Sequence, residues 1–129
     1  MSKSPVVAII DDDASVRATT DSLVRSLGYI VSTFASAEEF LRSDRLDDLS
    51  CVIADVQMPG MSGVELQAHL LTQGCPVPFI FFTAFPDERI RAQALAAGAI
   101  CYLTKPFHGD SLVHGLQAAL KKQDGEARK

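Results

Sequence analysis

The sequence has few cysteines and no cysteine motif. Its three cysteines are an odd number, and none of them forms a Cys-x-x-Cys pair of the kind found in metal and redox sites. Cys51 and Cys101 lie in apolar segments, where core positions are expected. We therefore predict reduced thiols and a cytoplasmic protein, because disulfide-stabilised domains belong to oxidising compartments.

Long apolar segments and an excess of positive charge are also missing. The apolar segment 95–103 is far shorter than the ~20 residues of a membrane-spanning helix, and residues 1–5 precede too short an apolar run for a signal peptide. A formal net charge of −4 argues against direct contact with nucleic acid. The glycine patterns of nucleotide-binding loops are absent. We predict that this domain binds neither nucleic acid nor a membrane.

The composition is that of one well-filled α/β domain. The chain has 129 residues, of which 47% are hydrophobic, and a chain of this length buries roughly two thirds of its unfolded surface without a disulfide or metal. Strands are expected at 6–10, 29–34, 50–54, 78–82 and 100–104, and helices at 14–27, 37–43, 62–72, 87–98 and 110–122. This alternation predicts a doubly wound five-stranded parallel sheet in the flavodoxin-like order 2-1-3-4-5, with helices on both faces.

Polar side chains end four of the expected strands. Asp11 and Asp12 follow the first strand, and Asp55 follows the third. Thr83 and Lys105 follow the fourth and fifth strands. The carboxyl ends of parallel strands meet at one edge of the sheet, and functional groups gather where the strand order reverses. Carboxylates suit Mg²⁺, and a hydroxyl and an ammonium beside them indicate phosphoryl chemistry.

The run of three acids also has a simpler interpretation as the end of a strand and the cap of a helix. For Asp13, which directly precedes the helix, we favour the cap. For Asp11 and Asp12 we favour metal binding, because three successive acids exceed what a cap requires. Without a metal, repulsion among Asp11, Asp12 and Asp55 should raise the pKa of at least one carboxyl group.

Five short motifs occur in a defined order: Asp11-Asp12, Asp55-Val56-Gln57-Met58-Pro59, Met61-Ser62-Gly63, Thr83-Ala84 and Lys105-Pro106-Phe107. The ordered set, over about residues 5–122, resembles the receiver domain of bacterial two-component response regulators, in the CheY-like superfamily. Segments 36–41 and 61–66 are most similar to receivers of nitrogen-fixation-type (FixJ-like) transcriptional regulators, which usually precede a helix-turn-helix output domain. The resemblance implies a receiver domain over residues 1–122 and a hydrophilic tail, or the start of a linker, at 123–129.

The resemblance implies a phosphoacceptor domain and not an enzyme acting on a separate substrate. Asp55 would accept a phosphoryl group from the phosphohistidine of a sensor histidine kinase. Mg²⁺ would be bound by Asp12 directly, by Asp11 through water, and by Asp55 and the backbone carbonyl of Gln57. Lys105 would contact a phosphoryl oxygen.

A conformational switch is also implied by the resemblance. The hydroxyl of Thr83 would turn toward the phosphoryl group, and Tyr102, at the position of the switch aromatic, would rotate inward. The expected result is a homodimer that forms through the fourth helix, fifth strand and fifth helix. The Lys105–Pro106 bond would be cis. Phe85 departs from the small or polar residues often found at its position, and it would restrict water near the phosphoryl group.

Two alternatives remain open. Residues 9–15 also resemble the Asp-x-Asp motif of haloacid-dehalogenase-type phosphatases, in which Asp11 would be the nucleophile and Asp13 the acid/base. That chemistry needs a further acidic pair after Lys105, and only isolated Asp110 and Asp124 follow. The other alternative is a stand-alone interaction module. Phosphate-independent modules of this kind typically lack one of the acids or the lysine, and this sequence keeps all of them.

Overall fold

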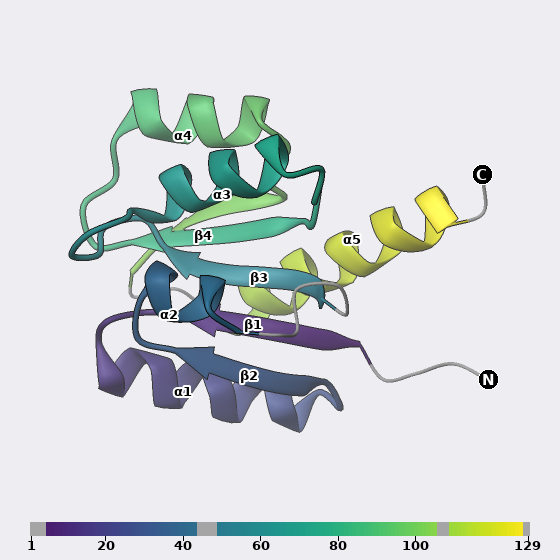
Figure 1. Cartoon of the computed structure of the whole chain (residues 1–129). Coiled ribbons are helices and arrows are strands. Elements are labelled where there is room, and N and C mark those ends of the chain that lie inside the picture. The colour runs from purple at the N-terminus through teal and green to yellow at the C-terminus, as the bar shows by residue number, and fades with distance from the viewer. Residues whose placement is uncertain (1–4, 44–48, 106–108, 128–129) are drawn as a thin grey trace.

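The computed structural model describes residues 5–43, 49–105 and 109–127 (Figure 1). Strands and helices alternate along the chain, as the sequence predicts. In chain order they are β1 (Val6–Ile10), α1 (Ala14–Ser26), β2 (Ile30–Phe34), α2 (Ala37–Leu41), β3 (Leu49–Asp55), α3 (Gly63–Thr72), β4 (Phe79–Thr83), α4 (Glu88–Ala96), β5 (Cys101–Thr104) and α5 (Gly109–Ala127).

The five strands form one parallel sheet in the order β2-β1-β3-β4-β5. This confirms the predicted doubly wound, flavodoxin-like topology. The order reverses between β1 and β3, which are neighbours in the sheet although β2 lies between them in the chain. The carboxyl ends of the strands lie together at the left of Figure 1, whereas the carboxyl end of α5 lies at the opposite side.

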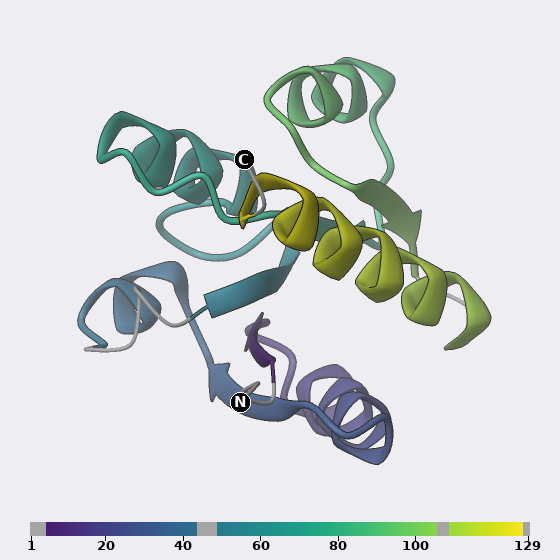
Figure 2. The same ribbon diagram turned by 90° about the vertical axis from the view of Figure 1, so that its right-hand side faces the viewer.

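The sheet separates two hydrophobic cores, because successive side chains of a strand point to opposite faces. Ile9 packs in a core with residues of α1 and α5, and Ile10 packs in a core with residues of α2, α3 and α4. On β4, Phe82 packs in the same core as Ile9, and Phe81 packs in the same core as Ile10. Figure 2, seen roughly along the strands, shows α1 and α5 on one side of the sheet and the other helices opposite them.

The loops that leave the strands are held by helix caps. The carboxylate of Asp13 accepts two backbone N–H groups of the first turn of α1, at 2.9 and 3.2 Å, so the predicted cap is present. At the start of α3 the hydroxyl of Ser62 accepts the N–H of Glu65, and the carboxylate of Glu65 accepts the N–H of Ser62. Both caps lie directly after loops that follow β1 and β3, and they fix the course of those loops.

The last helix is longer than the sequence predicts. We expected it to end near Lys122, but α5 continues to Ala127. A polar composition does not by itself stop a helix, and Gln123 and Glu126 are good helix formers. The domain boundary expected after residue 122 therefore falls inside a helix, and that boundary stays a prediction. Even at this length, no helix in the described part of the chain is long and apolar enough to cross a membrane.

Candidate functional site

The structure brings three of the predicted carboxyl groups together. Asp11 follows β1, and Asp55 ends the neighbouring strand β3. One carboxylate oxygen from each of Asp11, Asp12 and Asp55 lies within 4.8 Å of the other two. They meet because β1 and β3 run parallel, with Ile10 opposite Ala54 in the register. This spacing allows all three carboxylates to approach one cation.

Asp11 and Asp55 are the buried members of this acidic triad, and Asp12 is exposed; Asp11 is the more deeply buried of the two. Its Oδ1 accepts the backbone N–H of Asp13 at 2.9 Å. Its Oδ2 is enclosed and accepts no hydrogen bond among the described residues, although it lies 3.2 Å from Nζ of Lys105. Burial raises the pKa of Asp11 from 3.8 to about 6, and the charge of Asp55 adds a smaller increase against the opposing effects of Asp13 and Lys105. The rise in a carboxyl pKa that the sequence predicts is therefore present at Asp11, but its main cause is burial and not repulsion from Asp55.

Lys105 connects Asp11 to Asp55. Its Nζ donates to Oδ2 of Asp55 at 2.8 Å, while Oδ1 of Asp55 accepts the backbone N–H of Gln57 at 3.0 Å. Nζ also lies 5.0 Å from the centre of the Phe82 ring. Burial alone would lower the pKa of Lys105, but the hydrogen bond to Asp55 and the charges of both aspartates outweigh it and raise the pKa. Lys105 therefore stays charged and points inward. The cis bond expected before Pro106 lies outside the described residues.

Thr83 is fully buried, and its hydroxyl points to a partner other than Asp55. It donates to Oε1 of Gln57 at 2.6 Å and accepts the backbone N–H of Phe85 at 3.0 Å. The sequence drew attention to the carbonyl of Gln57 but not to its side chain. Its position two residues after Asp55 was the only signal that this side chain reaches the site.

Tyr102 is half-buried on β5 and packs against the core on the α2–α4 side of the sheet. Its hydroxyl is enclosed and has no hydrogen-bond partner among the residues that the structure describes. A buried hydroxyl without a partner is unfavourable by about 1–3 kcal/mol. A rearrangement that brings a hydrogen-bond partner to the Tyr102 hydroxyl would therefore stabilise the ring where it now lies.

Two side chains that the sequence did not single out support the site from neighbouring helices. Nη1 of Arg17 on α1 donates to the backbone carbonyl of Asp11 at 2.6 Å. Oε2 of Glu38 on α2 accepts the backbone N–H of Met61 at 2.9 Å, and this bond lowers the pKa of Glu38. Glu38 thereby connects α2 to the loop after β3. This loop turns closely around the Glu38 carboxylate at Gly60, whose φ of 78° favours glycine.

Gly63 lets the first turn of α3 lie against the end of β3. Its N–H donates to the carbonyl of Val56 at 3.0 Å. A Cβ at this position would overlap the backbone oxygen of Asp55 and would lie 3.1 Å from the ring of Phe81. The close approach therefore requires glycine, and it fixes the backbone of Asp55.

Gly63→Ala is expected to lower the free energy of unfolding by about 1–3 kcal/mol, because a methyl group would force the α3 and β3 backbones apart. Urea unfolding followed by circular dichroism measures this loss. Gly109→Ala is the matched control, since among the described residues a Cβ there meets only the side chain of Leu23, at 3.8 Å. Equal stability changes in the two variants would contradict the close-packing argument.

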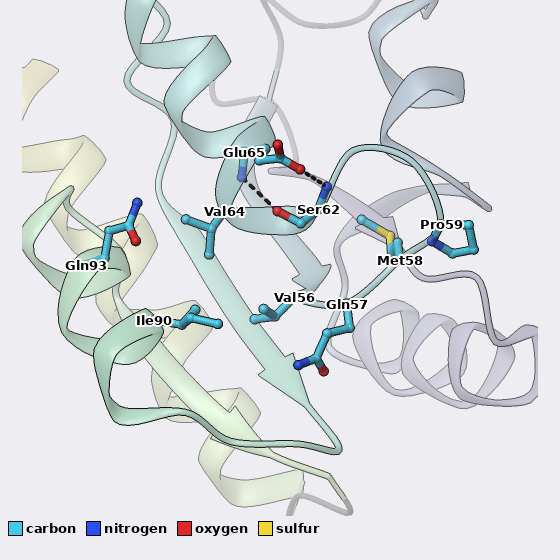
Figure 3. A pocket seen from close by; sticks show the side chains of 9 residues that line it. All are labelled: Val56, Gln57, Met58, Pro59, Ser62, Val64, Glu65, Ile90 and Gln93. Carbon is cyan, nitrogen blue, oxygen red and sulfur yellow. Dashed lines mark hydrogen bonds between the residues drawn. The ribbon is translucent and has the colours of Figure 1, made fainter.

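A groove of about 560 Å³ opens beside the site between α3 and α4 (Figure 3). Val64 lines it from α3, and Ile90 and Gln93 line it from α4. Gln57 also lines it, and the backbone N–H of Gln57 donates to Asp55 of the acidic triad. Rearrangement of Gln57 would therefore alter both the site and this groove.

Comparison with known proteins agrees with this geometry. Residues 7–117 match the family model of the response regulator receiver domain. The chain is 40% identical over 119 residues to the response regulator protein TodT of Pseudomonas putida, an alignment that covers 92% of this chain and 52% of TodT. It is 36% identical over 124 residues to the transcriptional regulatory protein FixJ of Bradyrhizobium diazoefficiens, covering 95% of this chain and 60% of FixJ. The structure of the response regulator StyR has a TM-score of 0.88 at 38% identity, covering 98% of this chain and 65% of StyR.

The fold and the acidic triad define an α/β domain of the flavodoxin-like class with an acidic site at the carboxyl edge of its sheet. The family match is more specific, and it shows that the chain belongs to the response regulator receiver domain family of two-component signalling. Receiver domains are not classical enzymes, so the haloacid-dehalogenase alternative has no support. The chain spans about half the length of the curated relatives that it matches.

Proposed function

We propose that this receiver domain accepts a phosphoryl group on Asp55 from the phosphohistidine of a sensor histidine kinase. The observation that carries the proposal is the arrangement of Asp55, whose two carboxylate oxygens are held by Lys105 and by the N–H of Gln57 beside two further acids. In the reaction a carboxylate oxygen of Asp55 forms a bond to phosphorus. The bond from phosphorus to the histidine nitrogen breaks, and its electron pair returns to the imidazole ring.

We further propose that Asp11, Asp12, Asp55 and the backbone carbonyl of Gln57 bind Mg²⁺. The enclosed Oδ2 of Asp11 faces the positive charge of Lys105, whose Nζ lies 3.2 Å away, and a carboxylate oxygen in this setting suits a cation or a cation-bound water. The ion would offset the negative charge of the acids as an anionic phosphoryl group approaches. Lys105 already contacts Asp55, and it would remain within reach of a phosphoryl oxygen on the same carboxylate.

Incubation with acetyl phosphate and Mg²⁺ tests this function. The intact mass should increase by one phosphoryl group, and this increase should disappear when a chelator removes the metal. A wild-type mass that does not change would contradict the proposal.

We propose that this domain controls the transcriptional output domain of a cytoplasmic regulator. TodT is a response regulator and FixJ a transcriptional regulatory protein, and both are longer than this chain. An output domain that binds DNA would account for the additional length of such proteins. The net charge of −4 favours DNA contact by that domain and not by the receiver itself.

We expect phosphorylation to change assembly through α4, β5 and α5. Thr83 ends β4, and Tyr102 lies on the neighbouring strand β5, so movement of the Thr83 hydroxyl is close to this face. In sedimentation velocity, the wild-type protein with Mg²⁺ and beryllofluoride, a phosphoryl mimic, should become a dimer. Asp55→Asn should stay monomeric under the same conditions. A wild-type monomer in both conditions would contradict the dimer and leave the phosphoacceptor assignment untouched.

A further inference from the structure

Three hydrogen bonds connect Gln57, Thr83 and Phe85 in a closed ring. The hydroxyl of Thr83 donates to Oε1 of Gln57 at 2.6 Å. Nε2 of Gln57 donates to the carbonyl of Phe85 at 3.4 Å. The N–H of Phe85 donates to the hydroxyl oxygen of Thr83 at 3.0 Å. The ring joins the loop after β3 to the loop after β4.

The ring uses the only hydrogen that the Thr83 hydroxyl can donate. A threonine hydroxyl has one O–H, so it cannot donate to Gln57 and to a phosphoryl oxygen on Asp55 at the same time. The hydroxyl oxygen also accepts the Phe85 N–H, and a rotation of the hydroxyl toward Asp55 would weaken that bond as well. Binding of a phosphoryl group by Thr83 therefore requires the ring to open.

The side chain of Gln57 is well placed to compete for this hydrogen. Its own backbone N–H donates to Oδ1 of Asp55 at 3.0 Å, so its main chain is fixed beside the acid. The side chain then extends to Thr83 along the end of the groove between α3 and α4 (Figure 3). Gln57 is itself exposed, so water can replace its bonds after the ring opens, and the energetic effect is that of one modest hydrogen bond.

We propose that the side chain of Gln57 is a positioning residue that holds the Thr83 hydroxyl away from Asp55 and so lowers the affinity of the site for a phosphoryl group. The ring also fixes the backbone of Phe85, so opening it releases the start of the loop that leads to α4. This inference rests on the proposed function of Asp55. It adds a residue whose side chain opposes the reaction instead of supporting it.

Gln57→Met tests the proposal, because methionine has a similar length but offers no amide group. Isothermal titration calorimetry with Mg²⁺ and beryllofluoride measures the affinity of the folded domain for the phosphoryl mimic. The dissociation constant should fall by about 2- to 12-fold, the range that corresponds to loss of one ordinary hydrogen bond. Gln93→Met is the matched control on the opposite wall of the groove, and it should leave the dissociation constant unchanged. Titration with Mg²⁺ alone measures the metal affinity of each variant, so that a change in affinity for the mimic is separated from any change in metal binding.

A double-mutant cycle separates this role from a general effect of the side chain near the site. In a Thr83→Val background no hydroxyl remains to be held, so Gln57→Met should no longer change the dissociation constant. In a Thr83→Ser background the hydroxyl is kept, and the effect of Gln57→Met should return. An unchanged affinity in Gln57→Met, or an equal gain with and without the Thr83 hydroxyl, would overturn the proposal. Wild-type protein that does not bind beryllofluoride at all would instead overturn the proposed function, and this inference with it.

Discussion

Asp55→Asn is expected to abolish phosphorylation by acetyl phosphate. The amide oxygen of asparagine is uncharged and is a much poorer nucleophile than a carboxylate. Asparagine keeps the shape of the side chain, and its oxygen can still accept the N–H of Gln57 that Asp55 accepts at 3.0 Å. The loss should therefore reflect chemistry and not misfolding. Intact-mass spectrometry should detect one phosphoryl group on the wild type and none on the variant.

Asp13→Asn is the matched control for this substitution. Asp13 is only two residues from Asp11, yet it caps α1, and asparagine is an equally good cap. This variant should gain a phosphoryl group as the wild type does. A phosphoryl group found on Asp55→Asn would show that another side chain is the acceptor.

Mg²⁺ is expected to stabilise the fold, and Asp12→Ala is expected to remove this response. A ligand that binds only the native state adds about 2.7 kcal/mol to the free energy of unfolding at a hundredfold excess over its dissociation constant. Asp12 is exposed, so its replacement should not damage the core. Without metal the variant should be as stable as the wild type or more stable, because one charge that repels Asp11 and Asp55 is gone. Thermal unfolding with and without Mg²⁺ measures both effects.

The response to Mg²⁺ should also depend on pH in a defined direction. The pKa of Asp11 is about 6 in the folded domain and near 3.8 for an ordinary aspartate, so the folded state binds more protons between these values. The ionised Asp11 therefore reduces stability progressively as pH rises from about 4 to about 6, and the penalty is complete above that range. Mg²⁺ should stabilise most at pH 7 and least near pH 5, where a proton competes for Asp11.

Equal Mg²⁺ effects on the stability of the wild type and of Asp12→Ala would contradict the metal site, because the metal would then bind elsewhere.

The positions of Asp11 and Asp55 could be predicted because they follow from strand ends and sheet order alone. An apolar run that stops at an acid places that acid at the carboxyl edge, and the alternating pattern places the first and third strands side by side. The end of α5 could not be predicted in this way, because the polar residues after Lys122 are compatible with a helix and with a tail. Local sequence does not decide between the two.

The hydrogen bonds of Gln57, Glu38 and Arg17 were missed for a different reason. Gln57 reaches Thr83 across 26 positions of the chain, and Glu38 reaches Met61 across 23. Such contacts depend on how loops pass each other, and an isolated glutamine, glutamate or arginine usually lies on a solvated surface. The course of the loops after β3 and β4 brings Gln57 and Glu38 to their partners, whereas Arg17, six residues from Asp11, reaches it from the first turns of α1.

The separation of the two cores by the sheet has a consequence for how this domain can change. Asp55 continues the row of Cys51 and Ile53, which packs toward α1 and α5, whereas Thr83 continues the row of Phe79 and Phe81 on the opposite face. The acceptor and the hydroxyl that would respond to it therefore continue rows that pack into different cores, although both lie at the carboxyl edge of the sheet, where Gln57 contacts each of them. Substitutions beneath α4 are expected to act first on the row that ends in Thr83, and substitutions beneath α1 and α5 on the row that ends in Asp55. The proposed assembly surface draws on both layers, because α4 packs on one core and α5 on the other.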